Sequence, residues 1–159
     1  MIRIEPYRPD DAPRLTEFVG AIQEYERRYV AGLRPGSEIA ADYAATVMKN
    51  VREAGGAILM ARQDGETVGF VSAWIRVDED LLLQEDVRRH AYISDIYVEE
   101  RVRQNGIASR LLGEIERTMR SRGCSRIRIC SKAANDAAMK CYESAGYQQY
   151  EVDFSKPLD

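Results

Sequence analysis

The stretch ISDIYVEERVRQNGIASRLL, Ile93–Leu112, decides the fold. Its first part is rich in β-branched and aromatic residues, which favours a strand. Its last part begins a run of apolar residues at helical spacing: Ile107, Leu111, Leu112, Ile115 and Met119. Between the two lies a charged turn that ends at Gly106. The stretch therefore predicts a strand, a short turn and a helix with an exposed N-terminus.

An exposed helix N-terminus suits an anion. The N–H groups of the first turn have no intrahelical partner and the helix dipole adds positive charge, so a phosphate fits there. Gly106 allows close approach to its N–H, while Ala108 and Ser109 keep the next turn slim. Arg103 adds a permanent charge. A plain strand–turn–helix connection explains the same pattern, so these residues alone leave both interpretations open.

Two motifs resemble those of a known family. RQNGIA, Arg103–Ala108, resembles the acetyl-CoA-binding motif of the GNAT (GCN5-related) N-acetyltransferases, (Gln or Arg)-x-x-Gly-x-(Gly or Ala). NDAAMKCYESAGY, Asn135–Tyr147, resembles the family's later motif, Asn-x-x-Ala-x-x-x-Tyr before a Gly-aromatic pair. The resemblance covers residues from about 91 to 150 and implies an acetyl-CoA-dependent enzyme.

Composition limits the other classes of function. The chain of 159 residues is expected to form one domain, residues 1–159, and its 45% hydrophobic and 31% charged residues are ordinary for a soluble protein. The net charge of −3 and the dispersed basic residues predict no nucleic-acid partner. No apolar run approaches the ~20 residues that span a bilayer, and the first residues, MIRIEPYRPDD, lack the apolar region of a secretory signal.

The three cysteines, Cys124, Cys130 and Cys141, lack CxxC spacing, and there is one histidine, so no metal site is expected. We predict free thiols in a reducing cytoplasm. We interpret Cys130 and Cys141 as small buried thiols rather than nucleophiles.

The order of elements predicts an α/β fold with a mixed sheet, β-α-α-β-β-β-α-β-α-β. Strands are expected over residues 2–6, 57–62, 67–75, 92–98, 126–130 and 147–154, and helices begin near residues 10, 37, 107 and 135. Residues 78–90 form an irregular or helical excursion. The GNAT resemblance implies that the two strands flanking the third long helix splay apart and that acetyl-CoA enters the gap.

The resemblance also implies which residues hold acetyl-CoA. The pyrophosphate is expected on the turn and first helical residues: Arg103, Gln104, Asn105, Gly106, Ile107, Ala108 and Ser109. The pantetheine arm is expected on the backbone of Ile96, Tyr97 and Val98, with an N–H near Val98 polarising the thioester carbonyl. Asn135 is either a CoA contact or a helix N-cap, and the two roles are compatible.

Two side chains are candidates for proton transfer. Tyr142 matches the tyrosine that the family uses as general acid for the departing thiolate, although on an amphipathic helix it also suits a core position. Asp95 lies within an apolar strand, on the same face as Tyr97, where a carboxylate is costly unless it is bonded or functional. It either accepts the amine's proton, directly or through water, or attracts a cationic amine, or is a structural acid paired with an arginine. Glu99 and Glu100 are expected to be solvated.

The acceptor side is less defined. The acidic segment VDEDLLLQED, Val77–Asp86, either attracts a cationic amine or forms a solvated excursion whose leucines pack down or against a second subunit in a homodimer. Tyr25 and Tyr29 line the acceptor side or belong to the core. The leading hypothesis is an N-acetyltransferase that acts on a primary amine of a small molecule or protein. The alternative is a catalytically silent GNAT-like module that binds acyl-CoA and regulates a partner.

Overall fold

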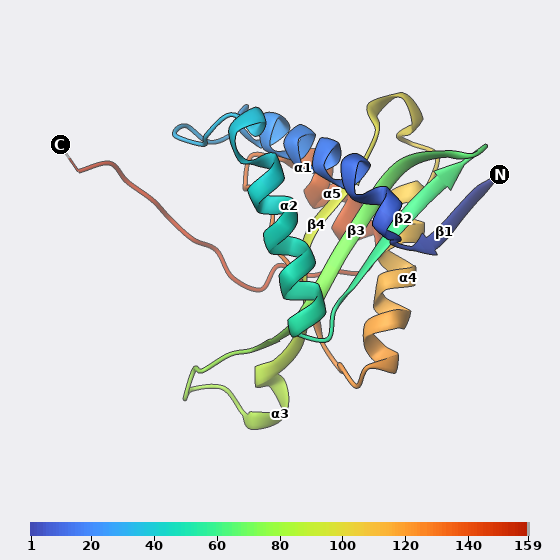
Figure 1. The fold of residues 1–159 in the computed structure, drawn as a ribbon. Coiled ribbons are helices and arrows are strands. Elements are labelled where there is room, and N and C mark those ends of the chain that lie inside the picture. The colour runs from blue at the N-terminus through green and yellow to red at the C-terminus, as the bar shows by residue number, and fades with distance from the viewer. Residues whose placement is uncertain (159) are drawn as a thin grey trace.

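A computed structural model describes residues 1–158, in which one five-stranded sheet runs in the order β1-β2-β3-β4-β5 (Figure 1). The strands are β1 (Ile2–Pro6), β2 (Ala57–Gln63), β3 (Glu66–Val77), β4 (Arg89–Val98) and β5 (Ile127–Ile129). Neighbouring strands are antiparallel except for β4 and β5, which are parallel. A parallel pair requires a crossover, and the long helix after β4 supplies it.

Helices cover both faces of the sheet, as the sequence predicts (Figure 1). The helices are α1 (Ala12–Glu26), α2 (Gly36–Glu53), α3 (Glu85–Arg88), α4 (Ile107–Ser121) and α5 (Asp136–Ser144). Short 3-10 turns occupy Pro9–Asp11 and Glu100–Val102. Helices α1 and α2 pack on one face and α4 on the other, with α5 beside it. No helix within residues 1–158 is both long and apolar enough to cross a membrane.

Each face has its own apolar core. The predicted stripe of α4 is buried against the sheet, and Leu111, Leu112 and Ile115 have no exposed surface. On the opposite face, Phe18 of α1 stacks on Phe70 of β3 with ring centroids 5.9 Å apart. The sheet is therefore fixed from both sides.

Helices α1 and α2 approach each other closely because each has a glycine where they cross, Gly20 in α1 and Gly36 in α2. A Cβ built on Gly36 would lie 2.4 Å from the carbonyl oxygen of Gly20. No other residue type fits at Gly36 without moving the helices apart.

A β-bulge reshapes β4 at its centre. Ser72 pairs with Asp95 and Ala73 pairs with Ile93, so Ser94 has no residue opposite it. On its other side β4 pairs with β5 only from Ala91 to Ile93. Past that point the two strands diverge, and the C-terminal half of β4 has no strand partner on the β5 side. The splay implied by the resemblance is present.

The predicted last strand over residues 147–154 is wrong for the single chain. No strand follows α5 within the described residues, and the segment leaves the body as an extended arm (Figure 1). Its apolar side chains are exposed: 47% for Tyr150, 64% for Val152 and 90% for Phe154. A strand requires a partner edge for its N–H and C=O groups, and this segment meets none in its own chain.

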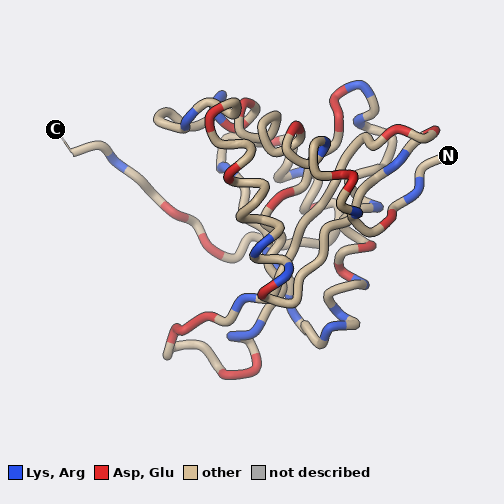
Figure 2. The backbone as a smooth tube through the Cα atoms, in the orientation of Figure 1, with Lys and Arg blue, Asp and Glu red and all other residues tan. Residues whose placement is uncertain are grey.

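A tight hairpin turn connects β2 and β3, the two strands expected over residues 57–62 and 67–75, with Asp64 and Gly65 at positive φ angles of 51° and 90°. Charges of both signs are interspersed along the chain, in keeping with its small net charge (Figure 2).

Candidate active site

A cavity of about 1180 Å³ opens where β4 and β5 diverge. It is larger than the roughly 300–1,000 Å³ typical of small-ligand pockets, so an extended ligand fits. Its walls come from the end of β4, the turn after it, the start of α4, the end of β5 and from α5, with α1 and α2 closing one end. Segments remote in sequence therefore converge on one site.

The first turn of α4 faces this cavity. Gly106 precedes the helix with a φ of +73°, a conformation that favours glycine, and no side chain caps the helix. Intrahelical bonding begins at Arg110, whose N–H donates to the Gly106 carbonyl at 3.1 Å. The N–H groups of the cavity-lining residues Ile107, Ala108 and Ser109 are thus the unpaired donors of a helix N-terminus. This end of the cavity suits a phosphate group.

Arg103, in the turn before α4, also lines the cavity. Its Nε donates to the Val98 carbonyl at 2.9 Å, and its guanidinium lies 5.3 Å from the Tyr25 ring centroid and 5.8 Å from that of Tyr97. Gln104 also lines the cavity, with a φ of +65°. Asn105 does not line it, because its side chain donates to the Val102 carbonyl at 3.2 Å and holds the turn.

The backbone of β4 presents hydrogen-bonding groups to the open side. The N–H of Glu99 donates to Val68 of β3 at 2.9 Å, whereas the carbonyl of Val98 faces away from β3 and accepts from Arg103. Because backbone groups alternate along an antiparallel pair, the N–H groups of Ile96 and Val98 point away from β3, into the splay. Ile96, Tyr97 and Val98 all line the cavity.

Asp95 lines the cavity and is buried, with 8% of its surface exposed. One oxygen accepts hydrogen bonds from hydroxyls of Ser94 at 2.6 Å, Tyr43 at 3.3 Å and Ser72 at 3.4 Å. Burial raises the pKa of Asp95, although the hydroxyl donors oppose the rise. Within residues 1–158 no arginine pairs with Asp95, so the structure does not form the arginine-paired acid that the sequence left open.

Tyr142 and Asn135 lie on α5 and both line the cavity. The Asn135 side chain accepts from the Ala138 N–H at 3.2 Å, which confirms the N-cap. Burial raises the pKa of Tyr142 above its usual value, and the neighbouring Cys141 adds to the rise. The hydroxyl therefore stays protonated at physiological pH and is available as a donor. It makes no hydrogen bond with any described residue.

Sequence reasoning missed several residues of the site. Glu26, at the end of α1, lines the cavity and contacts Lys132 at 3.8 Å. Tyr43 and Tyr92 flank Asp95 on the same wall. No local pattern distinguishes these residues, because they come from segments joined only by the fold. Tyr25 lines the cavity, and the hydroxyl of Tyr29 donates a hydrogen bond to the hydroxyl of Tyr25 at 3.1 Å.

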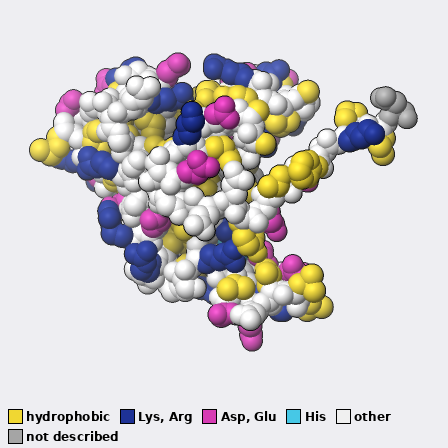
Figure 3. Space-filling view, turned by 180° about the vertical axis from the view of Figure 1, so that it is seen from behind, with side chains coloured by type: hydrophobic (Ala, Val, Ile, Leu, Met, Phe, Trp, Pro, Cys, Tyr) yellow, Lys and Arg dark blue, Asp and Glu magenta, His cyan; other side chains and the backbone are white. Residues whose placement is uncertain are grey.

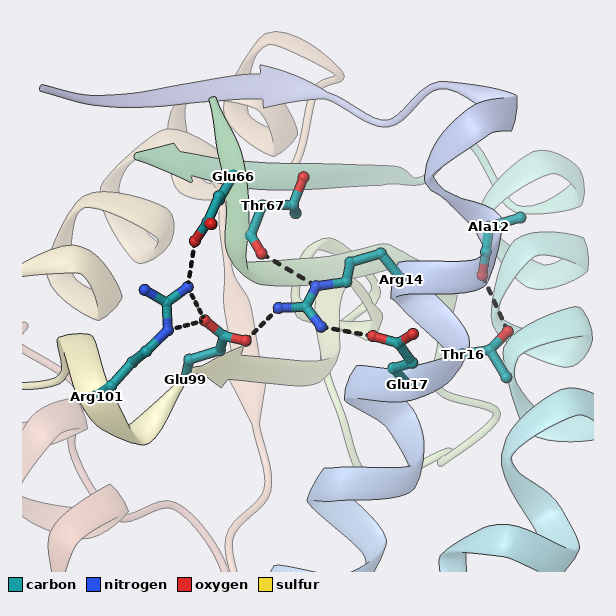
Figure 4. Close-up of polar contacts among 8 residues, drawn as sticks. All are labelled: Ala12, Arg14, Thr16, Glu17, Glu66, Thr67, Glu99 and Arg101. Carbon is teal, nitrogen blue, oxygen red and sulfur yellow. Dashed lines mark hydrogen bonds and ion pairs between the residues drawn. The ribbon is translucent and has the colours of Figure 1, made fainter. Parts of the chain in front are cut away.

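The prediction that Glu99 is solvated is wrong, because only 18% of its side chain is exposed. It is held between Arg14 of α1 and Arg101, and Arg101 also pairs with Glu66 at 2.7 Å (Figure 4). The Nε of Arg14 donates to the Thr67 carbonyl at 3.1 Å. This network ties α1 and β3 to the residue that directly follows Val98, so it fixes the start of the turn that leads from β4 to α4.

The remaining candidates lie elsewhere or differ from expectation. No residue of the segment 77–86 lines the cavity. Cys130 is exposed and Cys141 half-buried, and both line the cavity, so the interpretation of two buried thiols is wrong for Cys130. Among residues 1–158, no group of three or more His, Cys, Asp or Glu side chains could hold a metal ion.

Solved structures share this architecture. The aminoglycoside acetyltransferase AAC(6')-Iy, in complex with a CoA-linked bisubstrate analogue, superimposes with a TM-score of 0.72 at 17% identity, covering 100% of this chain and 99% of that one. An aminoglycoside 6'-N-acetyltransferase of Acinetobacter haemolyticus gives 0.70 at 19% identity, covering 99% of each chain. The fold and its splayed strands therefore define a GNAT-fold protein.

The sequence comparisons carry the assignment further. The model of the acetyltransferase (GNAT) family matches residues 18–147, and the chain belongs to that family. It is 26% identical over 131 residues to an aminoglycoside N(6')-acetyltransferase of Stenotrophomonas maltophilia, covering 80% of this chain and 82% of that protein. A thialysine N-ε-acetyltransferase of Bos taurus is 33% identical over 60 residues, 38% of this chain and 35% of that protein.

Proposed function

We propose that this protein transfers the acetyl group of acetyl-CoA directly to a primary amine of a small, cationic acceptor. One observation carries the proposal. A single cavity joins the open N-terminus of α4 to the buried carboxyl of Asp95 and the hydroxyl-bearing ring of Tyr142. Donors suited to an anion and two candidate proton-transfer groups thus line one continuous cavity.

The donor end fits acetyl-CoA by its chemistry. The N–H groups of Ile107, Ala108 and Ser109 together with Arg103 can hold a pyrophosphate. The backbone of Ile96 and Val98 can pair with the amides of the pantetheine arm, which then replaces the missing strand beside β4. In this pose the Val98 N–H would stabilise negative charge on the thioester oxygen.

The chemistry follows from two groups with raised pKa values. The nitrogen of a neutral amine attacks the thioester carbon, and the resulting tetrahedral species breaks its carbon–sulfur bond. Asp95 takes the proton that the amine loses, since burial makes this carboxylate a stronger base. Tyr142 donates toward the departing sulfur, since its hydroxyl stays protonated. The acetyl group ends on nitrogen; Asp95 then releases the amine's proton to solvent, and the CoA thiolate, held by the Tyr142 hydroxyl, takes up a proton from solvent, so that both side chains return to their starting state.

The acceptor end favours a cation with several amines. Glu26 and Asp95 bring two carboxylates to the wall that also carries Tyr25, Tyr43 and Tyr92. Carboxylates attract ammonium groups, and aromatic faces bind cations and sugar-like rings. Two of the proteins that the chain resembles are named as aminoglycoside acetyltransferases. We therefore expect an aminoglycoside-like amine rather than a protein side chain.

We further propose that the protein works in the cytoplasm, since Cys124, Cys130 and Cys141 are all free thiols. We also expect it to act as a homodimer, in line with the apolar side chains that remain exposed at Leu81 and Leu82.

Binding and turnover are tested separately. Acetyl-CoA should raise the melting temperature, while ATP and NAD should not; a ligand at about a hundred times its Kd stabilises by ~2.7 kcal/mol. CoA release is then followed by a thiol reagent with a panel of aminoglycosides, polyamines and lysine peptides. An absence of any shift with acetyl-CoA would refute the donor assignment. A clear shift without CoA release from any amine would replace the enzyme by the silent acyl-CoA-binding module.

A further inference from the structure

A lysine of the chain itself lies on the wall of the cavity. Lys132 follows β5, and its Nζ lies 3.8 Å from a carboxylate oxygen of Glu26, which ends α1. Within residues 1–158, Lys132 is the one lysine that lines the cavity and the one basic side chain within ion-pair distance of Glu26. The chain thus places a primary ammonium group, the chemical group of the proposed acceptor, on a carboxylate of the cavity.

Glu26 occupies a position where a helix by itself disfavours a carboxylate. The C-terminal end of a helix dipole is negative, so it stabilises cations rather than anions. Glu26 is the last residue of α1, and the last turn of this helix contains no basic residue. The carboxylate and the helix end therefore both favour a cation at this point, and Lys132 supplies one from a distant segment.

Glu26 also lies within electrostatic reach of the proposed proton-transfer groups. Burial is the main cause of the raised pKa values of Asp95 and Tyr142, and the charge of Glu26 adds to the rise of both. A cation on Glu26 is thus near the proposed place of acetyl transfer without being the group that reacts. The reacting amine must lose its proton before it attacks, whereas a group held by Glu26 keeps its charge.

The contact between Lys132 and Glu26 is weak enough to be exchanged. Its 3.8 Å exceeds the roughly 2.7–2.9 Å of a strong charged hydrogen bond, and the two side chains are 39% and 31% exposed. An exposed pair of this kind changes an equilibrium constant by about fivefold at most. The backbone of Lys132 is held separately, because its carbonyl accepts from the Asn135 N–H at 2.9 Å. The side chain can therefore leave Glu26 while the turn before α5 stays in place.

The outer surface offers little discrimination between amines on the face that Figure 3 shows. Basic and acidic side chains are interspersed there among the residues drawn in colour, and no broad acidic patch is visible. A broad field of one sign would attract any cation. Discrimination between amines is therefore expected from carboxylates inside the cavity.

We propose that Glu26 holds a second, unreacting ammonium group of the acceptor, and that Lys132 occupies this subsite until the acceptor displaces it. The acceptor is then a diamine or polyamine, with one nitrogen acetylated beside Asp95 and another bound to Glu26. Lys132 makes the subsite selective, because only a ligand that brings a second cation gains from displacing the lysine. The inference rests on the proposed function for the reaction, while binding alone tests the subsite.

The test compares diaminoalkanes, from putrescine upward, with the monoamine of the same carbon chain. In Lys132→Met the ratio of the diamine KM to the monoamine KM should fall about two- to fivefold, the factor that an exposed ion pair contributes. In Glu26→Gln the ratio should rise, and adding Lys132→Met should change it no further. Lys132→Arg keeps the charge and should keep the unmodified ratio. Lys140→Met is the matched control, because it removes one positive charge from α5 outside the cavity.

Calorimetry of diamine binding without acetyl-CoA separates this inference from the proposed function. Tighter binding to Lys132→Met and weaker binding to Glu26→Gln would support the subsite even if no amine released CoA. Turnover with equal diamine affinity in Lys132→Met and the unmodified chain would overturn the subsite and leave the proposed function in place. Weaker diamine binding to Lys132→Met, an equal gain in Lys140→Met, or no diamine binding to any variant would also overturn it.

Discussion

Tyr142→Phe removes one oxygen atom from the wall of the cavity and leaves the ring. The ring is packed among partly buried apolar residues on the α4 face of the sheet, with its centroid 6.2 Å from that of Tyr147. The hydroxyl makes no hydrogen bond with any described residue, so its loss breaks no contact that holds the fold. We therefore expect an unchanged melting temperature and unchanged acetyl-CoA binding.

The effect on turnover follows from acid strength. Burial places the pKa of Tyr142 above its usual value, whereas a thiol has a pKa of about 8.5. Full proton transfer from the tyrosine to the thiolate is thus uphill, and the main contribution is a hydrogen bond to the developing negative charge on sulfur. Such a bond is worth about 1.5–3 kcal/mol, and kcat should fall about 10- to 150-fold. This is less than the ~10⁴-fold upper range of general acid catalysis.

The assay is CoA release at saturating acetyl-CoA and acceptor, with a single-turnover measurement to show that chemistry limits the rate. Tyr147→Phe is the matched control, because its hydroxyl bonds Glu116 on α4 and not the cavity. That variant should lose about 1.5–3 kcal/mol of stability, since the lost bond is to a carboxylate, and keep its kcat. If Tyr142→Phe retains kcat within about twofold while chemistry limits the rate, the tyrosine is not the acid, since a lost charged hydrogen bond costs more.

Four further outcomes are expected. Gly106→Glu should abolish acetyl-CoA binding, because it places an anion beside the N-terminus of α4. Gly106→Asn is the control: asparagine tolerates the φ of +73° and is uncharged, so this variant should still bind acetyl-CoA measurably. Equal affinity of the two variants for acetyl-CoA would show that the phosphate does not bind at this site. Asp95→Asn should lower kcat/KM about 10²- to 10⁴-fold and abolish the acidic limb of the pH profile, which in the unmodified enzyme reports loss of the base as pH falls through its raised pKa. The raised pKa of Asp95 means that its buried charge destabilises the fold at neutral pH. Asp95→Asn should therefore have a higher melting temperature than the unmodified chain at pH 7, and this difference in melting temperature should shrink toward pH ~4. A lower melting temperature of the variant at pH 7 would contradict the expected direction. Gly36→Ala should lower the free energy of unfolding in urea by about 1–3 kcal/mol, because the added Cβ would overlap the Gly20 carbonyl. Gly113→Ala on α4 is the control and should not lower it, since its added Cβ meets only Arg117 at 3.9 Å. Equal stability of the two variants would show that α1 and α2 move apart without cost.

Local sequence patterns predicted most of the helices and strands, because the spacing of apolar residues reflects which face of an element is buried. The helical spacing of Leu111, Leu112 and Ile115 predicted which face of α4 is buried, and all three have no exposed surface. The charged turn ending at Gly106 predicted an open helix N-terminus, and no side chain caps α4. The spacing from Asn135 predicted the start of α5 and its cap.

The arm shows where local patterns fail. The alternation of Tyr150, Val152 and Phe154 predicts a strand, but alternation specifies only that one face must be covered, not by which molecule. In the single chain the segment has no partner edge and remains extended. Glu99 fails for a similar reason, because Arg14, 85 residues earlier in the chain, reaches it only in the fold.

The sequence by itself determined the family, through two short motifs, and the order of most elements, through hydrophobic periodicity. Both are local properties, since a motif and a period can be read within a dozen residues. Only the tertiary structure decided how the proposed acceptor end of the cavity is built, because Glu26, Tyr43 and Asp95 come from three elements that meet at the cavity. It also decided the environment of Asp95: burial, which raises the pKa of this carboxyl against the opposing effect of its three hydroxyl donors, exists only when the chain is folded.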